Sequence, residues 1–343
     1  MNESWENGEK EFLKKLFKFM NVQGDEWRDD SIIVPISESI SLAYSIDNVS
    51  QIYNMPNREK SFICYGRWAA SVISNDIIAC GIAPKGLALD VGMDGFTEED
   101  FFCFVQGVLD VCNKYGMKYE GGNLNTGKNV SGISWGLSDA SKIISRSGAR
   151  DNSILLATCN VGTGWAIKLL GEDIRNITCY SKELETYKET PMVNLDLFKE
   201  IWDLDVVLCG MDLTDGIIEF GYEIFERTGL GVVFDFSNNY SKFLEETSEV
   251  LTVPIDALRF EPGYDTPFAH GWCISEDNLG KVIEVFKKYK IDFTILGRVD
   301  SHYNGVFYSS KNNLKQLPKY WDDKVRSYGG IKSWRSTILP LFI

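Results

Sequence analysis

The sequence predicts an α+β protein built from two domains. Segments with the two-residue period of strands alternate with segments of helical period along most of the chain, a pattern that favours an α+β or an α/β class. With 343 residues, of which 44% are hydrophobic, the chain is long and apolar enough for two cores. A compact apolar strand at Ile154 opens a second block of elements, so we expect one domain at residues 1–150 and another at residues 151–343.

The first predicted elements follow from hydrophobic periodicity. Residues 11–20 place Phe12, Leu16 and Met20 on one face and lysines on the other, which predicts an amphipathic helix. The Ile-Ile-Val run within residues 31–36 is typical of a short buried strand. Residues 39–46 alternate apolar with polar side chains, as a half-buried strand does.

Two longer helices are predicted from residues that commonly start or stop a helix. Residues 67–80 are rich in Ala, Val and Ile and stop at Gly81, with Pro84 shortly after. Residues 97–115 begin with Thr97 and a run of acidic residues, which cap a helix and complement the positive end of its dipole. Strands are expected beside them at residues 85–91, 117–120 and 133–144.

The second block shows the same alternation. A strand at residues 154–158 runs into the glycine-rich segment 160–164 and a helix from Trp165. The segment is similar to a phosphate-binding loop but lacks the Gly-Lys-Ser/Thr ending of a P-loop. Further helices are expected at residues 195–204, 217–228 and 279–289, and further strands at residues 206–210, 231–236 and 291–299.

The charge balance argues against several classes of partner. Asp and Glu number 49 and Lys and Arg 35, for a net charge of −14, which opposes binding to a nucleic-acid backbone. No apolar run reaches the ~18 residues that a membrane span needs, and the acidic start of the chain is no secretory signal. We expect a small-molecule substrate, and neither a nucleic acid nor a membrane as partner.

Cysteine and histidine usage narrows the chemistry. The eight cysteines include no Cys-x-x-Cys pair, and several lie in apolar surroundings, which favours a reduced chain in the cytoplasm. The two histidines, His270 and His302, have no Cys or His at ligand spacing. Zinc sites and histidine-based catalytic triads are therefore poorly supported.

Asp76 is the strongest single candidate for a functional residue. It lies within an apolar helical segment, where a carboxylate costs several kcal/mol unless it is paired or bound to a metal. The structural alternative is a partly exposed helix aspartate bonded to a neighbouring turn.

Asp212 and Asp215 stand three residues apart at the start of the helix predicted from Ile217. This spacing puts both on one side of the first turn, where they suit a ligand role. The alternative is helix capping by Asp212 or Thr214, since both residue types are good caps.

Asp29, Asp30 and Asp47 flank predicted strands and complete a set of scattered carboxylates. Two like charges ~4 Å apart repel by about 1 to 4 kcal/mol, so converging carboxylates need a cation. Magnesium prefers oxygen ligands and usually takes one or two carboxylates together with substrate phosphates. The set therefore predicts Mg²⁺ at Asp29, Asp30, Asp47, Asp76 and Asp212, and a nucleotide phosphate beside it.

Two further segments offer contacts to phosphate. Gly121, Gly122 and Asn123 are predicted to form a turn whose backbone a ligand approaches closely, although a plain hairpin turn explains the glycines equally well. Arg146 and Arg150 bracket a short turn, and arginine has the fork geometry that suits phosphate. Solvated or ion-paired surface arginines are the structural alternative.

These motifs, in this order, resemble the ATP-binding superfamily of thiamine-monophosphate kinase, aminoimidazole ribonucleotide synthetase, formylglycinamidine ribonucleotide synthetase and selenophosphate synthetase. The resemblance covers roughly residues 10–235. It rests on Asp29-Asp30 before a strand, Ser45-Ile46-Asp47, Asn75-Asp76 in a helix that ends Gly81-Ile82-Ala83-Pro84, Arg146-Ser147-Gly148-Ala149, and Asp212-Leu213-Thr214-Asp215-Gly216.

The resemblance implies an aminoimidazole-ribonucleotide-synthetase-like fold and a homodimer whose N-terminal sheets form a shared barrel. It also implies ATP with Mg²⁺, with Asp47, Gly121, Gly122, Asn123 and Arg146 at the nucleotide. The sequence departs from the kinase pattern at three places. Trp27-Arg28 replaces a glycine, Asn123 replaces an aspartate, and the stretch 48–54 differs. Gly-Asn at 122–123 is similar to the formylglycinamidine synthetase pattern.

The preferred hypothesis is a magnesium-dependent small-molecule kinase in which Asp212, Asp215 and Arg146 are the catalytic residues. A synthetase or cyclo-ligase that activates an amide or carboxyl oxygen by phosphorylation is the first alternative. A non-catalytic nucleotide-binding subunit is the second. We expect the wall of the acceptor pocket to come from the stretches 48–57 and 260–270. Tyr264, Phe268 and Trp272 either stack on a flat substrate or pack in the core.

Overall fold

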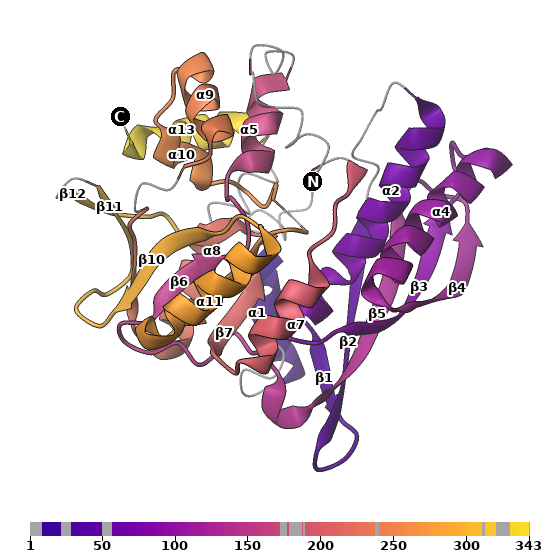
Figure 1. Cartoon of the computed structure of the whole chain (residues 1–343), viewed down its shortest axis with the longest axis horizontal. Helices are drawn as coiled ribbons and strands as arrows, with labels where there is room; N and C mark the ends of the chain where they lie inside the picture. The colour runs from indigo at the N-terminus through magenta and orange to yellow at the C-terminus, as the bar shows by residue number, and fades with distance from the viewer. Residues whose placement is uncertain are drawn as a thin grey trace.

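The computed structural model describes residues 9–21, 29–49, 57–171, 177, 187, 189–236, 240–265, 267–310, 313–319 and 330–342. Two separate β-sheets organise this part of the chain (Figure 1). The sheets draw on consecutive stretches of sequence, since one uses strands up to Asp139 and the other strands from Ile154. An α+β class is thus confirmed. The division at residue 150 falls in the connection between the sheets and stays a prediction.

The first sheet has five strands in the order β1-β2-β5-β3-β4. All its pairings are antiparallel except β3 with β4. Its strands are β1 (Ile32–Pro35), β2 (Ile40–Val49), β3 (Pro84–Gly92), β4 (Lys118–Asn125) and β5 (Val130–Asp139).

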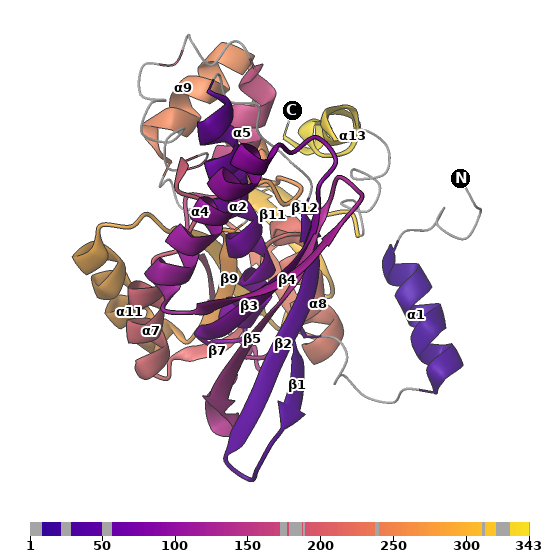
Figure 2. The ribbon, with the colours of Figure 1, turned by 90° about the vertical axis from the view of Figure 1, so that its right-hand side faces the viewer.

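Helices α2 (Arg58–Ile73) and α4 (Glu98–Tyr115) pack on one face of this sheet (Figure 2). The short helix α3 (Asn75–Ala79) follows α2 directly. The amphipathic helix α1 (Glu9–Met20) precedes β1, and a 3₁₀ turn, η2 (Ala140–Lys142), follows β5.

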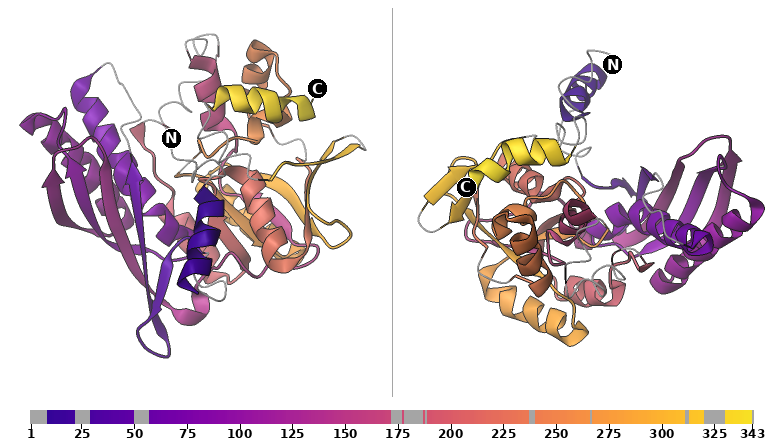
Figure 3. Two further views of the ribbon diagram at one scale, coloured as in Figure 1. Left: turned by 180° about the vertical axis from the view of Figure 1, so that it is seen from behind. Right: turned by 90° about the horizontal axis from the view of Figure 1, so that it is seen from above.

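The second sheet has seven strands in the order β12-β11-β8-β10-β6-β9-β7, with β11 and β8 parallel. Helix α8 covers one face and helices α7 and α11 the other (Figures 1 and 3). Its strands are β6 (Ile154–Ala157), β7 (Val207–Asp212), β8 (Gly231–Phe234), β9 (His270–Ile274), β10 (Thr294–Asp300), β11 (Val306–Ser310) and β12 (Asn313–Gln316). Its helices are α5 (Thr163–Leu170), α7 (Leu195–Asp203), α8 (Gly216–Thr228), α9 (Lys242–Leu251), α10 (Ile255–Arg259), α11 (Glu276–Tyr289), α13 (Ile331–Thr337) and the 3₁₀ turn η4 (Leu339–Leu341).

One hydrophobic core is shared by both sheets. It joins Phe104 of α4 and Ile73 of α2 to Leu156, Trp272 and Phe286 of the second sheet and its helices. A second core lies on the α8 side of the seven-stranded sheet. Helices α7 and α11 therefore bridge the two halves of the chain, and the right-hand view of Figure 3 shows these halves side by side.

Several predicted boundaries need correction. The helix predicted at 67–80 is two helices, because Asn57 caps an earlier start by accepting from the Lys60 N–H at 3.0 Å and because the chain breaks at Ser74. The strand predicted at 133–144 ends at Asp139, and the strand predicted at 117–120 continues to Asn125. The capped start of α4 is confirmed, since Thr97 and Asp100 form a reciprocal capping box.

No helix in the described part of the chain is both long and apolar enough to cross a membrane. The seven cysteines within the described residues are free thiols.

Candidate functional site

Four distant segments bring charged side chains to one place beside the first sheet. Arg146, just after η2, donates from Nε to Asp30 Oδ1 at 3.2 Å and also forms a hydrogen bond to this oxygen from Nη2. Its backbone N–H donates to Asp29 Oδ1 at 2.6 Å. Asp76 of α3 and Asp212 of β7 lie within electrostatic range of this pair. The predicted convergence of Asp30, Asp76, Arg146 and Asp212 is therefore present in the fold.

The acidic side chains of this group resist ionisation. Burial, together with the negative charges of Asp212 and Asp29, raises the pKa of Asp30 to about 7 despite its ion pair with Arg146. Burial also raises the pKa of Asp76 well above its ordinary value, and the charges of Asp212, Asp30 and Asp47 add to the effect. The site thus holds more carboxyl groups than one arginine can keep ionised.

Asp212 is held by two neutral donors. Its side chain is 2% exposed, and it accepts from Asn75 Nδ2 at 3.0 Å and from Thr214 Oγ1 at 3.2 Å. Burial raises its pKa, and the charge of Asp215 has the same effect. Asp215, rather than Asp212, occupies the N-cap position of α8. The capping alternative therefore does not account for Asp212.

Asn75 is in turn bonded to His270. The Asn75 Oδ1 atom lies 2.6 Å from His270 Nε2, and both residues are buried. Burial lowers the pKa of His270 to about 3, so the ring is neutral. The sequence analysis did not predict either residue as part of the site. For Asn75, its position directly before Asp76 could have indicated such a role.

The donor set fits a hydrated divalent cation with a polyphosphate. Asp30, Asp76 and Asp212 have the hard oxygen atoms that such a cation prefers, and a cation would relieve their mutual repulsion. Within the described residues, no three His, Cys, Asp or Glu side chains stand together closely enough to hold a metal by themselves. This agrees with magnesium chemistry, in which one or two carboxylates suffice and phosphate oxygens and waters complete the shell.

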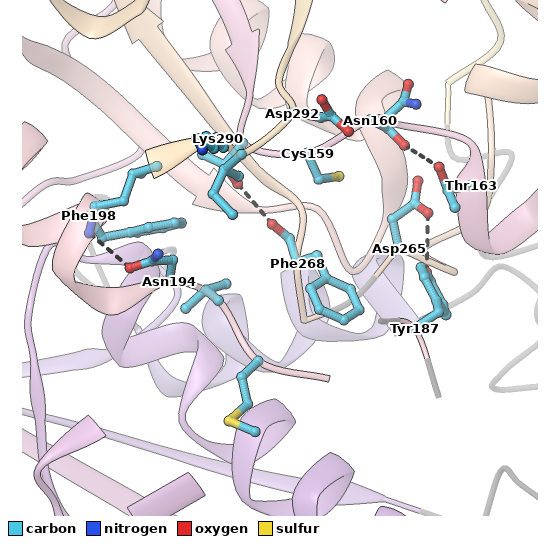
Figure 4. A pocket seen from close by; sticks show the side chains of 15 residues that line it. Cys159, Asn160, Thr163, Tyr187, Asn194, Phe198, Asp265, Phe268, Lys290 and Asp292 are labelled. Atoms are coloured by element: carbon cyan, nitrogen blue, oxygen red, sulfur yellow. Dashed lines mark hydrogen bonds between the residues drawn. The ribbon is translucent and has the colours of Figure 1, made fainter. Parts of the chain in front are cut away.

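A cavity of about 220 Å³ opens beside strands β6 and β9 of the second sheet (Figure 4). Phe198 of α7 and Phe268 form part of its wall, and Asp265, Lys290 and Asp292 line it as charged groups. Thr158 also lines it and is bonded to the main chain of His270, which is the strand partner of Asp212. Two strand spacings of ~4.8 Å separate Thr158 from Asp212, so the cavity begins ~10 Å from the carboxylate group.

Residues 28–137 match the family model of the AIR synthase related protein, N-terminal domain. A solved structure described as AaThiL complexed with AMPPCP and TMP superposes with a TM-score of 0.70 at 20% identity, covering 92% of this chain and 97% of that one. The thiamine-monophosphate kinase of Pyrococcus horikoshii is 22% identical over 258 residues, which is 74% of this chain and 76% of that protein. That of Buchnera aphidicola subsp. Schizaphis graminum is 23% identical over 285 residues, covering 81% and 85%.

Residues 28–137 therefore form an AIR synthase related N-terminal domain, and the chain as a whole is similar to thiamine-monophosphate kinases. The resemblance drawn from the ordered motifs is thus confirmed, as is the two-sheet α+β fold.

The turn predicted at residues 121–123 is wrong. Gly121, Gly122 and Asn123 do not form a turn but lie within β4. A Cβ atom on Gly122 would stand 1.7 Å from the Leu89 carbonyl oxygen, so glycine is needed for strand pairing at the register shift of β3 and β4. Asn123 donates to Asp90 Oδ1 at 3.0 Å. Asn48 aligns with Asn123 across the sheet, so the two side chains lie on the same face. Because side chains alternate along a strand, Asp47 lies on the opposite face, within electrostatic range of Asp76.

The glycine-rich segment after β6 also differs from a phosphate loop. The N–H groups of Gly162 and Gly164 donate to the two carboxylate oxygens of Asp265 at 2.5 and 2.6 Å. A side chain of the protein thus occupies the donors that a phosphate would use.

Of the aromatic candidates, Phe268 lines the cavity, as a stacking residue would. Tyr264 packs against Trp165 with ring centroids 5.0 Å apart, and Trp272 is buried in the core. Trp27, Arg28 and most of the stretch 48–57 lie outside the described residues.

Proposed function

We propose that this protein is a magnesium-dependent enzyme that transfers the γ-phosphoryl group of ATP to a small-molecule acceptor, in the manner of a thiamine-monophosphate kinase. The observation that carries the proposal is the group Asp30, Asp76 and Asp212, which three separate segments bring within electrostatic range of one arginine. Relatives named thiamine-monophosphate kinases and a structural neighbour described with AMPPCP support the nucleotide.

In this proposal the metal would bind within the group Asp29, Asp30, Asp47, Asp76 and Asp212, with Asp212 among the one or two carboxylates that contact it directly. Asp215 would assist from the start of α8. A bound Mg²⁺ supplies charge neutralisation for the phosphates and aligns them with the acceptor. Arg146, fixed by Asp30 and Asp29, presents positive charge to the transferred phosphoryl group. Phosphoryl transfer depends mostly on positioning and electrostatics, so the site needs no strong general base.

The cavity beside Phe268 is the proposed acceptor pocket. It combines apolar and aromatic side chains with polar and charged ones, so it can bury a small molecule and also orient it. Its distance from Asp212 of ~10 Å, two strand spacings, is compatible with an acceptor that reaches from the cavity to the phosphates.

ATP with Mg²⁺ is expected to raise the midpoint of thermal unfolding. Ligand at ~100 times its dissociation constant adds about 2.7 kcal/mol to the free energy of unfolding. The shift should require both components, because the metal screens the carboxylates from the phosphates. Absence of any shift at millimolar ATP and Mg²⁺ would refute the proposal.

Product analysis separates the chemical alternatives. A kinase leaves the phosphoryl group on the acceptor and releases no free phosphate, whereas a synthetase or cyclo-ligase releases one phosphate per turnover. Nucleotide binding without turnover on any acceptor would favour a non-catalytic subunit.

We also propose a homodimer formed through the outer face of the five-stranded sheet. The face opposite α2 and α4 exposes large apolar side chains from three neighbouring strands, namely Ile32, Val34, Ile40, Ile46, Ile133 and Leu137. Ile46 and Ile133 are direct cross-strand partners and are 66% and 43% exposed. Monomeric proteins rarely leave such a contiguous patch uncovered. A second copy of the same sheet would bury it and build the shared barrel.

Ile46→Asp is therefore expected to convert the dimer into a monomer, because it places a charge in the middle of the buried face. Light scattering coupled to size-exclusion chromatography should give twice the chain mass of 38.8 kDa for the native protein and that mass for the variant. Phe102→Asp is the matched control, since Phe102 is 61% exposed on α4, away from this face. A native protein that runs as a monomer would exclude the proposed interface.

A further inference from the structure

Asn75 stands between an acidic residue of the site and a histidine. Its Nδ2 atom donates to Asp212 Oδ2 at 3.0 Å, and its Oδ1 atom lies 2.6 Å from His270 Nε2. All three side chains are at most 2% exposed, so water does not compete for these bonds. Asn75 lies in α3, Asp212 in β7 and His270 in β9. Strands β7 and β9 are paired, and Asp212 is the direct cross-strand partner of His270.

The direction of the bonds fixes the proton on the imidazole. A carboxylate only accepts, so the amide group of Asn75 turns its nitrogen to Asp212 and its oxygen to the ring. That oxygen only accepts as well, and His270 Nε2 must therefore carry the hydrogen. The ring is the neutral tautomer with its lone pair on Nδ1.

The His270 ring is itself held firmly. It stands edge to face against Phe198 at a centroid distance of 5.0 Å and an interplanar angle of 87°. Its main chain is bonded on both sides to Thr158, through the His270 N–H to Thr158 Oγ1 at 2.9 Å and the Thr158 N–H to the His270 carbonyl at 3.0 Å. A ring in this setting cannot turn away from Asn75 without breaking the packing of Phe198.

We propose that His270 is a positioning residue for the metal–nucleotide site, acting through Asn75 to fix the orientation of the Asp212 carboxylate. This inference rests on the proposed function, in which Asp212 contacts the metal. If the histidine donor is removed, the Asn75 oxygen is buried without a partner, and the amide gains by rotating away from Asp212. Asp212 would then lose a donor and its single orientation.

Three variants test this role. His270→Leu removes the donor, whereas His270→Gln keeps an N–H group near the position of Nε2. His302→Gln is the matched control, because His302 is exposed on the loop after β10 and the chain has only these two histidines. The Mg²⁺ concentration for half-maximal binding of a non-hydrolysable ATP analogue is measured for each, together with thermal stability.

We expect His270→Leu to raise this Mg²⁺ concentration by about 10- to 100-fold, the range found when partners of metal ligands are removed. His270→Gln should restore most of the affinity, and His302→Gln should leave it unchanged. A long-range ¹H–¹⁵N spectrum of histidine-labelled native protein should show the proton on Nε2 of His270, with the His302→Gln variant providing the assignment.

Two results would overturn the role of His270. One is a proton on Nδ1 in the native protein, and the other is a folded His270→Leu variant with native Mg²⁺ dependence. If His270→Leu does not fold, the spectrum and the His270→Gln variant decide the question. A native protein that binds no Mg²⁺–nucleotide would instead refute the proposed function on which the inference depends.

Discussion

Replacing Arg146 with alanine is expected to lower kcat for ATP-dependent phosphoryl transfer by about 10³-fold. This is the lower end of the contribution made by an arginine that stabilises the transferred phosphoryl group. The same change removes the partner of Asp30, whose side chain is only 2% exposed. Breaking a buried ion pair costs about 3 kcal/mol or more in unfolding free energy. Steady-state kinetics and denaturant titration without nucleotide measure the two effects separately.

Arg150→Ala is the matched control for Arg146→Ala. Arg150 lies four residues further along the same connection, but its side chain is exposed and no acidic residue of the site depends on it for charge balance. It should change kcat and stability little. Equal effects of the two substitutions would remove Arg146 from the proposed catalytic set.

Asp76→Asn is expected to make the nucleotide-free protein more stable and to abolish Mg²⁺-dependent ATP turnover. The substitution keeps the shape of the side chain but removes a carboxyl group whose ionised form is disfavoured by burial and by the charges of Asp212, Asp30 and Asp47. Repulsion between two such charges ~4 Å apart amounts to about 1 to 4 kcal/mol, which sets the scale of the gain. Chemical denaturation and an ATP turnover assay check the two halves of this prediction.

The gain should also depend on pH. The folded-state pKa of Asp30 is about 7, above its ordinary value of 3.8, and that of Asp76 is raised as well. Between pH 3.8 and about pH 7, the folded protein therefore binds more protons at this site than the unfolded chain does. The free energy of unfolding contributed by the site therefore falls as pH rises from about 4 to about 7. Asp76→Asn should flatten this dependence, and a variant less stable than the native protein at pH 8 would contradict the electrostatic account.

The acidic residues of the site were predictable because each breaks a local rule. Asp76 places an acidic side chain in an apolar helix, and Asp212 is the last residue of a largely buried strand. Such conflicts between local preference and residue type are what functional sites produce. The turn at Arg146 was found through its arginines and its resemblance to a family motif.

The roles of Asn75 and His270 were not predictable in the same way. Their contact joins residues 195 positions apart and depends on β9 pairing with β7, and β9 itself was not predicted. The turn assigned to Gly121 and Gly122 failed for a related reason. Their positive φ angles serve a strand register shift against Leu89, which only the tertiary pairing reveals.

The core that joins Phe104 and Ile73 to Leu156, Trp272 and Phe286 ties the two halves of the molecule together. A fragment that contains only the second sheet would keep the packing of Trp272 against Phe198 and Phe286 but lose the part of this core that α2 and α4 supply. Such a fragment should be less stable and more prone to aggregate than the whole chain. Hinge opening between the halves would expose side chains of this core. We therefore expect ligands to reach the acidic group and the cavity through local side-chain and loop movements, without separation of the two sheets.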